Sequence, residues 1–211
     1  MTIKTFTFNP FQENTYLIHD ETGEAVIIDA GCLYDTEERL LKQYFDENKL
    51  ELKRVLNTHL HLDHQFGNKF LFNTFGILPE ACKEDEFLLQ NVINHARVFG
   101  LAINEKAQEL GAYITDNQEI KFGNITLIAI HVPGHSPGSM AFYSKLDGVL
   151  FAGDVLFQNS IGRTDLERGD YATLIRSITE RLLPLPDSTV VFCGHGSNTT
   201  IGSEKENNPY L

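Results

Sequence analysis

Four apolar segments of the chain each end in a histidine or an aspartate, and this repeated pattern is the feature that most restricts the fold. The segments and their closing residues are VLNTH with His59, IAIHVPGH with His135, VLFAGD with Asp154 and VVFCGH with His195. Short apolar runs bounded by such turns are typical of buried strands. In open α/β sheets, ligands bind beyond the carboxyl ends of the strands. We therefore expect the four polar side chains to meet at one edge of a sheet.

Other apolar patterns predict strands and helices that alternate along the chain. The predicted strands cover residues 2–8, 14–20, 24–31, 54–59, 125–132, 139–144, 148–153 and 189–194. The predicted helices cover residues 35–48, about 65–75, 84–110 and 171–183. This order indicates an α/β protein, or a layered sandwich built from two halves. Without a linker-like stretch, it favours a single domain over residues 1–211 with a helical insert at about 84–110.

The composition restricts the compartment and the partners. The chain has 211 residues, a formal net charge of −12 and three cysteines without paired spacing, Cys32, Cys82 and Cys193. Nucleic acids and anionic membranes attract dense Lys and Arg, so neither is an expected partner of this acidic chain. No run approaches 18 apolar residues, and the first residues lack the apolar core of a signal peptide. We expect a cytoplasmic protein with reduced thiols, and the sequence predicts no particular oligomeric state.

The segment RVLNTHLHLDHQFGN concentrates most of the metal-binding residue types. With the other strand ends, it brings the number of candidate ligands to seven: His59, His61, Asp63, His64, His135, Asp154 and His195. One zinc ion usually takes four ligands, so seven suit two metal ions that share a carboxylate. Imidazole with carboxylate suits zinc, iron, manganese or nickel. We expect two divalent ions, with zinc preferred over iron or manganese.

Two such ions would supply the chemistry of a hydrolase. Metal ions about 3.5–4 Å apart lower the pKa of a bridging water from 15.7 toward about 7, so that hydroxide is available as the nucleophile. Two zinc ions with Asp63, Asp154 and hydroxide leave a formal charge of about +1 in the pocket. We therefore expect an anionic small molecule as the substrate, although the protein as a whole is acidic.

Several motifs, in this order, resemble the metallo-β-lactamase superfamily. They are IDAG at 28–31, THLHLDH at 58–64, HVPGHSPGSM at 131–140, GDVLF at 153–157 and CGHG at 193–196. The resemblance covers nearly the whole chain. It implies a four-layer αββα sandwich with two metals at one edge of the sheets.

The resemblance also implies how the seven ligands divide. The first metal would be bound by His59, His61 and His135, and the second by Asp63, His64 and His195, with Asp154 bridging both. Asp63 would also orient the hydroxide, which would make it a catalytic residue.

Two further segments are similar to the glyoxalase II-like branch of this superfamily, in its short bacterial type. They are NSIGRTDLERGD at 159–170 and TTIGSEKENNPYL at 199–211. The similarity implies hydrolysis of an anionic thioester such as S-D-lactoylglutathione. The alternative is a mononuclear iron persulfide dioxygenase on the same fold, in which GRTD also occurs. A β-lactamase is a weaker interpretation, because a periplasmic enzyme would need a signal peptide.

Some residues near these motifs have two possible roles. Asp29 either supports the His-rich loop or simply forms a turn. His131 either orients a ligand or has a buried structural role. Arg163 and Asp165 either form a salt bridge within their loop or contact the substrate. For Cys193, we expect a packed side chain of apolar character rather than a ligand.

Overall fold

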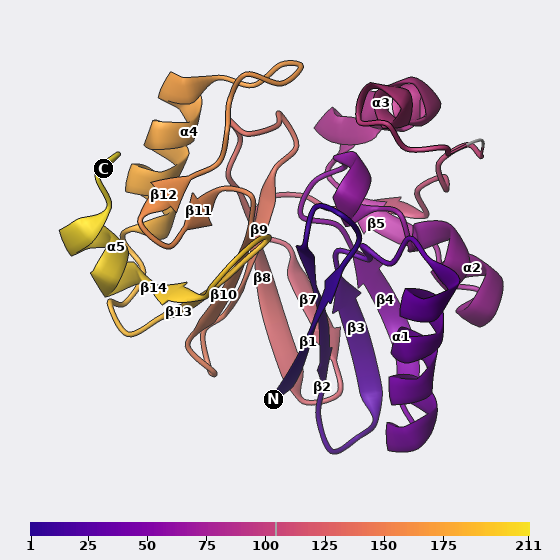
Figure 1. Ribbon diagram of the computed structural model, residues 1–211. Coiled ribbons are helices and arrows are strands. Elements are labelled where there is room, and N and C mark those ends of the chain that lie inside the picture. The colour runs from indigo at the N-terminus through magenta and orange to yellow at the C-terminus, as the bar shows by residue number, and fades with distance from the viewer. Residues whose placement is uncertain (104) are drawn as a thin grey trace.

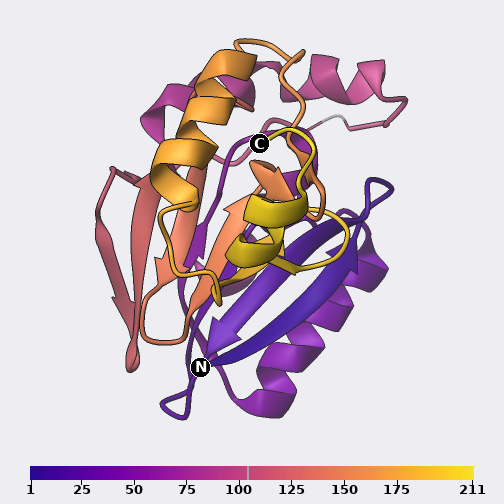
Figure 2. The same cartoon turned by 90° about the vertical axis from the view of Figure 1, so that its left-hand side faces the viewer.

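Two mixed β-sheets lie face to face in the protein, with helices on the outer face of each (Figure 1). The structure, a computed structural model, describes residues 1–103 and 105–211. Figure 2 shows the layers from another side, with the orange helix α4 (Tyr171–Ser177) and the purple helix α1 (Asp35–Asn48) on opposite sides of the strands. The predicted four-layer αββα sandwich is confirmed.

Each sheet has six strands and contains both parallel and antiparallel pairs. The first sheet runs in the order β1 (Thr2–Phe8), β2 (Glu13–His19), β3 (Glu24–Ile28), β4 (Glu51–Leu56), β5 (Pro79–Ala81) and β6 (Ala112–Tyr113). The second runs in the order β14 (Thr199–Thr200), β13 (Val190–Cys193), β10 (Val149–Gly153), β9 (Met140–Ser144), β8 (Ile125–His131) and β7 (Glu119–Phe122). A small hairpin, β11 (Leu156–Phe157) with β12 (Ser160–Ile161), follows β10.

The parallel pairs decide where the site forms. Strand β3 pairs in parallel with β4, and β10 pairs in parallel with β13. Parallel neighbours end at the same edge of their sheet. The residues that follow β3 and β4 therefore emerge together, as do those that follow β10 and β13. This geometry follows the expectation drawn from the four strand ends.

Three apolar layers hold the sandwich together. The layer between the sheets includes Ile28 and Leu56 from the first sheet and Phe142 and Phe151 from the second. A second layer packs the first sheet against α1 and α2 (Asn68–Phe75), and a third packs the second sheet against α4 and α5 (Ile201–Asn207). These four residues are fully buried, so the inner faces around them are shielded from water. Burial of apolar surface of this kind is the main force that stabilises such layers.

The helical insert is shorter than predicted. It consists of a 3₁₀ helix, η2 (Lys83–Asn91), followed by α3 (Val92–Val98). Gly100, with φ of 74°, has the left-handed conformation that commonly ends a helix. Residues 99–103 and 105–110 form no helix, and the prediction for residue 104 lies outside the described residues. Likewise α4 ends at Ser177 and continues as a π-helical turn, η3 (Ile178–Leu182). Among the described residues, no helix has the length and apolar character needed to cross a membrane.

Candidate metal centre

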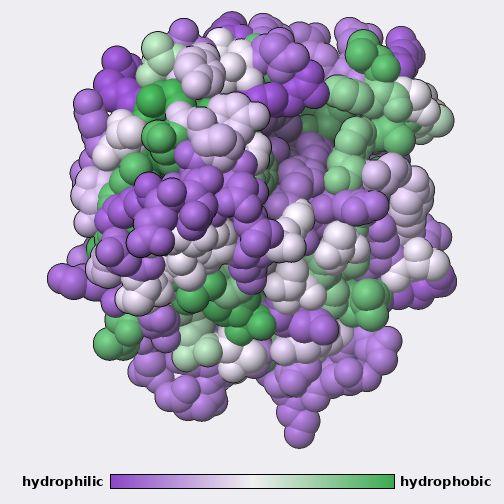
Figure 3. Space-filling model, turned by 60° about the vertical axis from the view of Figure 1, so that its left-hand side comes forward, coloured by the Kyte–Doolittle hydropathy of each residue, from purple (hydrophilic) through white to green (hydrophobic). Residues whose placement is uncertain are grey.

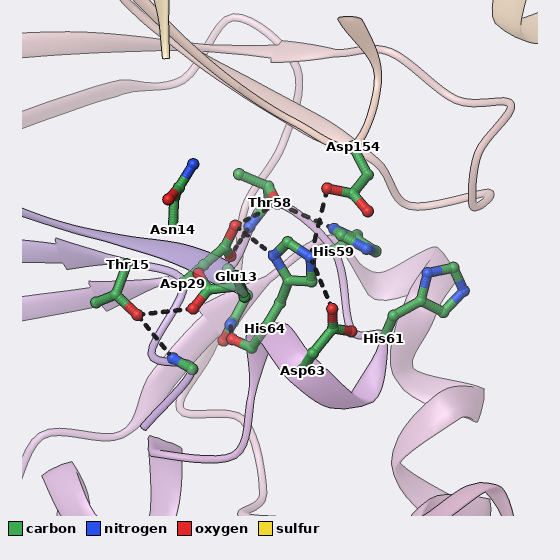
Figure 4. A network of polar contacts seen from close by, with 12 residues as sticks. Glu13, Asn14, Thr15, Asp29, Thr58, His59, His61, Asp63, His64 and Asp154 are labelled. Carbon is green, nitrogen blue, oxygen red and sulfur yellow. Dashed lines mark hydrogen bonds and ion pairs between the residues drawn. The ribbon is translucent and has the colours of Figure 1, made fainter. Parts of the chain in front are cut away.

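Seven histidine and aspartate side chains converge beyond the carboxyl ends of the strands. Figure 4 shows His59, Asp63, His64 and Asp154 facing one another, with His61 beside them. Six of the seven fall into two groups in which the possible ligand atoms lie within 4.8 Å of one another, and a third group of this kind joins His59 and His64 with Asp29. The first group is His59, His61 and His135; the second group is Asp63, His64 and His195. These are the two sets that the family resemblance implies, and their binding of metal stays a prediction.

The first group contains only imidazoles. His59 and His61 lie on the loop after β4, where His61 has extended backbone that lets both side chains reach the same volume. The Nδ1 atom of His61 lies 2.9 Å from Nε2 of His135, and that Nε2 lies 3.2 Å from Nε2 of His59. Three ring nitrogens this close are arranged as they would be around one cation.

The second group combines a carboxylate with two imidazoles. Asp63 and His64 belong to the 3₁₀ turn η1 (Leu62–His64), which turns the chain directly after His61. The Oδ2 atom of Asp63 lies 3.1 Å from Nε2 of His195 and 3.7 Å from Nε2 of His64. A mixed set of nitrogen and oxygen donors suits zinc, iron or manganese.

Asp154 lies between the two groups. Its Oδ1 is 3.4 Å from Nε2 of His64, and its Oδ2 is 3.5 Å from Nε2 of His195 and 3.8 Å from Nε2 of His135. Gly194 leaves the space for this carboxylate, because a Cβ atom there would lie 2.1 Å from Oδ1 of Asp154. One carboxylate therefore faces ligand atoms of both groups.

Two buried atoms at this junction lack hydrogen-bond partners within the described part of the chain. They are Nε2 of His64 and Oδ1 of Asp154. Buried polar atoms are almost always paired with protein, water or an ion, so an orphaned pair marks a place for a ligand. A cation held by His64 and Asp154 would satisfy both atoms. The donor set and these two atoms thus fit a metal ion.

Four histidines are held so that Nε2 faces the centre. The Nδ1 atoms of these rings contact other protein atoms: His59 contacts Thr58 Oγ1 at 3.0 Å, His64 contacts Asp29 Oδ2 at 3.0 Å, His135 contacts the Arg163 carbonyl at 2.8 Å and His195 contacts the Phe11 carbonyl at 3.1 Å. Such contacts are typical of metal-binding histidines, because they fix the ring and its tautomer. His61 is the exception, since its Nδ1 faces the centre.

The electrostatics of the two groups differ. Burial and the neighbouring imidazoles hold the pKa of His59 well below its ordinary value, and burial with His135 lowers the pKa of His61 to about 3. In the second group, burial would lower the pKa of His195, but hydrogen bonds to Asp154 and Asp63 outweigh it and raise this pKa to about 10. Burial also opposes protonation of His64, yet the surrounding carboxylates raise its pKa well above the ordinary value.

Comparison with known proteins identifies the family. The model of the metallo-β-lactamase superfamily matches residues 8–195. The chain belongs to the metallo-β-lactamase superfamily. A protein of Haemophilus influenzae named hydroxyacylglutathione hydrolase GloC is 42% identical over 100% of this chain and 98% of its own length.

Solved structures of this superfamily superimpose closely on the chain. The crystal structure of BLEG-1 B3 metallo-beta-lactamase is 36% identical with a TM-score of 0.87, covering 100% of this chain and 99% of that one. The crystal structure of TTHA1623 in a di-iron-bound form is 36% identical with a TM-score of 0.86, covering 99% of this chain and 100% of that one. The fold and the His/Asp clusters of this chain are thus those of a metallo-hydrolase superfamily and are suited to binding metal ions.

For the residues with two possible roles, the contacts in the structure show which role applies. Asp29 is buried and accepts hydrogen bonds from the Thr58 backbone N–H at 2.7 Å and the Thr58 hydroxyl at 2.6 Å, in addition to its contact with His64. It therefore supports the His-rich loop. His131 instead contacts the Pro137 carbonyl at 2.9 Å and lies outside both groups. It braces its own loop and orients no ligand directly.

Arg163 and Asp165 form the predicted ion pair. Arg163 Nε lies 2.6 Å from one carboxylate oxygen of Asp165, and a terminal guanidinium nitrogen lies 2.8 Å from the other. Both side chains are exposed, and it is the backbone carbonyl of Arg163 that holds His135. Cys193 is fully buried, as expected for a packed side chain, and Cys32 is also buried.

Two residues that hold the loops of the site, Asp85 and Asn14, are not predictable from local sequence patterns. Asp85, from η2, is fully buried and accepts hydrogen bonds from the Leu60 N–H at 3.2 Å, the Ser136 hydroxyl at 2.7 Å and the Gly138 N–H at 2.6 Å. It thereby joins the two loops that carry the first group. No local signal marks it, because Asp85 lies within the charged run KEDE, which resembles a solvated surface.

Asn14 is the other missed residue. Its side-chain amide donates to the Cys193 carbonyl at 3.1 Å and the Gly196 carbonyl at 3.0 Å, and its N–H donates to the Gly194 carbonyl at 2.8 Å. The start of β2 thus clamps the CGHG loop that carries His195. In the sequence, Asn14 lies among polar residues before a strand, where asparagine is common in turns.

Proposed function

We propose that the protein hydrolyses thioesters with two divalent metal ions bound at this centre, zinc being the expected metal. The observation that carries the proposal is the pair of complete ligand groups with Asp154 between them. Each group offers three donors, and Asp154 lies within 3.8 Å of nitrogen donors in both. Seven donors exceed what one zinc ion takes, and they match two ions that share a carboxylate.

The residues of the chain have distinct tasks in this reaction. When bound, the two ions would lower the pKa of water toward about 7 and so supply hydroxide at neutral pH. Asp63 lines the pocket beside His195. Its carboxylate would accept a hydrogen bond from the attacking water and so direct the water oxygen at the thioester carbon. The new C–O bond would replace the C–S bond, and the leaving thiolate would take up the proton that the hydroxide loses when the carboxylate product forms.

The first substrate to test is S-D-lactoylglutathione, an anionic thioester. The full-length relative named hydroxyacylglutathione hydrolase GloC supports this choice. The neighbour in a di-iron-bound form makes iron the second metal to consider. One bound iron with oxygen consumption would instead match a persulfide dioxygenase.

The test combines metal quantification with two assays on one preparation. We expect about two metal ions per chain, hydrolysis of S-D-lactoylglutathione, and no oxygen uptake with glutathione persulfide. Removal of metal by a chelator should abolish hydrolysis, and zinc should restore it. A suitable control is His19→Gln, because His19 contacts Tyr44 and lies outside both groups.

Two results would contradict the proposal. The first is a hydrolytically active preparation without bound zinc, iron or manganese. The second is one iron per chain with stoichiometric oxygen consumption and no thioester hydrolysis, which would establish the dioxygenase alternative.

A further inference from the structure

A pocket with largely apolar walls opens directly above the candidate metal centre. Its volume is about 380 Å³, which is within the range of small-molecule sites. The floor includes His61, Asp63, His135, Asp154 and His195. The walls contribute six apolar side chains: Phe11, Leu62, Leu88, Val98, Phe99 and Leu166. A substrate that reaches the floor must therefore lie against these side chains.

One wall holds apolar side chains in contact with water. Val98 and Phe99, at the end of α3, are 81% and 48% exposed. Figure 3 shows hydrophobic surface gathered at the upper right of one face, beside a hollow. Exposed apolar groups that border a functional cleft are typical of a binding surface, because a ligand removes them from water.

This wall is connected to the centre itself. The ring of Phe99 packs edge-on against Phe11 at a centroid distance of 5.5 Å, and Phe11 stacks on Phe66 at 6.5 Å. The carbonyl of Phe11 holds Nδ1 of His195. Phe99 is thus connected to His195 of the second group through Phe11.

The loop that carries Leu166 also contacts the insert that carries Leu88. Leu166 belongs to the loop 162–170, and Leu88 belongs to the insert. Arg168 of that loop lies over the ring of Phe87 at 3.8 Å from its centroid, and a cation–π contact of this kind is attractive. The two apolar walls are therefore joined before any ligand binds.

The charged side chains in the walls of the pocket do not favour an anionic group of the substrate there. Among the described lining residues, Arg163 is the single Lys or Arg, and Asp165 already pairs with it through two hydrogen bonds. Glu167 adds a negative charge, and His95 is the remaining ionisable wall residue. A carboxylate on the wall side would thus find no uncompensated Lys or Arg there.

We propose that this pocket binds an uncharged apolar group of the thioester, against Phe99, Val98 and Leu166. The inference rests on the proposed thioester hydrolysis and specifies its substrate class. The apolar group belongs either to the acyl side or to the thiol side of the thioester. Each methylene buried there should raise kcat/KM about threefold to fourfold.

Two substrate series distinguish the two sides. In the first, acetyl, butanoyl and hexanoyl groups are carried on glutathione; in the second, the acetyl group is carried on ethanethiol, butanethiol and hexanethiol. We expect kcat/KM to rise with chain length in one series, and that series identifies the side that occupies the pocket. Two flat series in an enzyme that hydrolyses these thioesters would overturn the inference and leave the proposed function intact.

A binding measurement keeps the inference testable if no thioester is hydrolysed. Calorimetry with the metal-loaded protein compares S-methyl- and S-hexyl-N-acetylcysteamine, which are neutral thioethers that cannot react. We expect the hexyl compound to bind at least 30-fold more tightly. It has five more methylenes, and a gain of about threefold for each would exceed 30-fold in total. Equal affinity for the two compounds would overturn the inference, whatever the catalytic result.

Substitutions in the wall test whether Phe99 and Val98 cause the dependence on chain length. Phe99→Ser and Val98→Ser change exposed side chains, so both should fold, and their melting temperatures check this. We expect the gain per methylene to fall below about twofold in either variant. The control is Leu146→Ser, because Leu146 is 91% exposed in the turn between β9 and β10, outside the residues that line the pocket. If both variants keep the full rise in kcat/KM per methylene, this wall does not bind the substrate.

Discussion

The two groups of candidate ligands are neighbours, but they hold protons differently. In the first group, burial lowers the pKa values of His59 and His61, so both rings are neutral at pH 7 and ready for a cation. In the second group, the pKa of His195 is about 10, and that of His64 is also raised. A metal ion must therefore displace protons from the second group and none from His59 and His61.

The groups also differ in what supports them. Asp85 joins the loops of the first group through Leu60, Ser136 and Gly138. Asp29 contacts His64 of the second group directly. The difference teaches that one candidate centre can combine rings that are neutral at pH 7 with rings that hold protons. Asp85 holds the loops of the first group, whereas Asp29 contacts His64 directly and reaches His59 only through Thr58.

The largest effect is expected from Asp154→Asn, which tests whether the groups act together. The amide lacks the charge that faces donors of both groups, so affinity for both metals should fall and kcat should drop by about 10⁴-fold. Metal analysis and steady-state kinetics measure this. Asp46→Asn, which changes an exposed partner of Lys42, is the matched control. Loss of one metal with the other fully retained would show that Asp154 serves a single group.

A smaller effect is expected from Asp63→Asn, which separates the groups. Much of the metal should remain, because the first group is intact, while kcat falls by about 10²–10³-fold as the attacking water loses its hydrogen-bond acceptor. Metal content, kcat and the melting temperature are measured together. Unchanged hydrolysis would contradict the assignment of water orientation to Asp63.

Asp85→Asn should weaken the first group selectively. The amide keeps the size of the side chain but replaces one of the two acceptor oxygens by an N–H₂ donor, so either the Leu60 N–H or the Gly138 N–H loses its acceptor. We expect affinity for the first metal to fall about 10–100-fold, as for other residues behind metal ligands. A competition titration with a chromophoric chelator measures each metal step. Asp29→Asn is the counterpart, expected to weaken the step that involves His64. If Asp85→Asn and Asp29→Asn both weaken the same one of the two metal-binding steps, the two groups are not supported by different carboxylates.

The smallest effect is a difference in pH dependence between the two metal steps. The pKa of His195 is raised in the metal-free protein, so protons compete with the metal below about pH 10, and affinity of the second group should rise with pH by up to about tenfold per unit for each displaced proton. The pKa of His61 is about 3, so this ring adds no pH dependence near neutrality. Stepwise titrations at pH 6, 7 and 8 measure both slopes. Equal slopes would show that the groups do not differ in proton binding.

Much of the fold was predictable from local patterns. The apolar runs that end in His or Asp indicated strands, and the motif order indicated the αββα sandwich that the structure confirms. The helix predicted over residues 84–110 was too long, because exposed residues around Gly100 carry helix-like apolar spacing although the backbone there is left-handed. A pattern of residue types does not report the conformation of a single glycine.

The candidate ligands of the site were predictable from the sequence, but the residues that hold them in place were less so. All seven predicted ligands come together, since four of them follow β4 and the others follow β8, β10 and β13, whose carboxyl ends meet at one edge. Asp85 and Asn14 escaped notice, because their importance lies in contacts with backbone groups far away in the chain. Such contacts leave no periodicity in the sequence. The apolar wall was missed for the same reason, since Phe11 and Phe99 meet only in three dimensions.

By itself, the sequence determined which residue types stand at the strand ends and in what order, and these are local properties of short segments. Only the tertiary structure decided which ring nitrogen of each histidine faces the centre, how charge divides the two groups and which side chains border the pocket. The physical reason is that these properties depend on long-range contacts, such as that of His195 with the Phe11 carbonyl, and on burial, which exists only once the two sheets have closed.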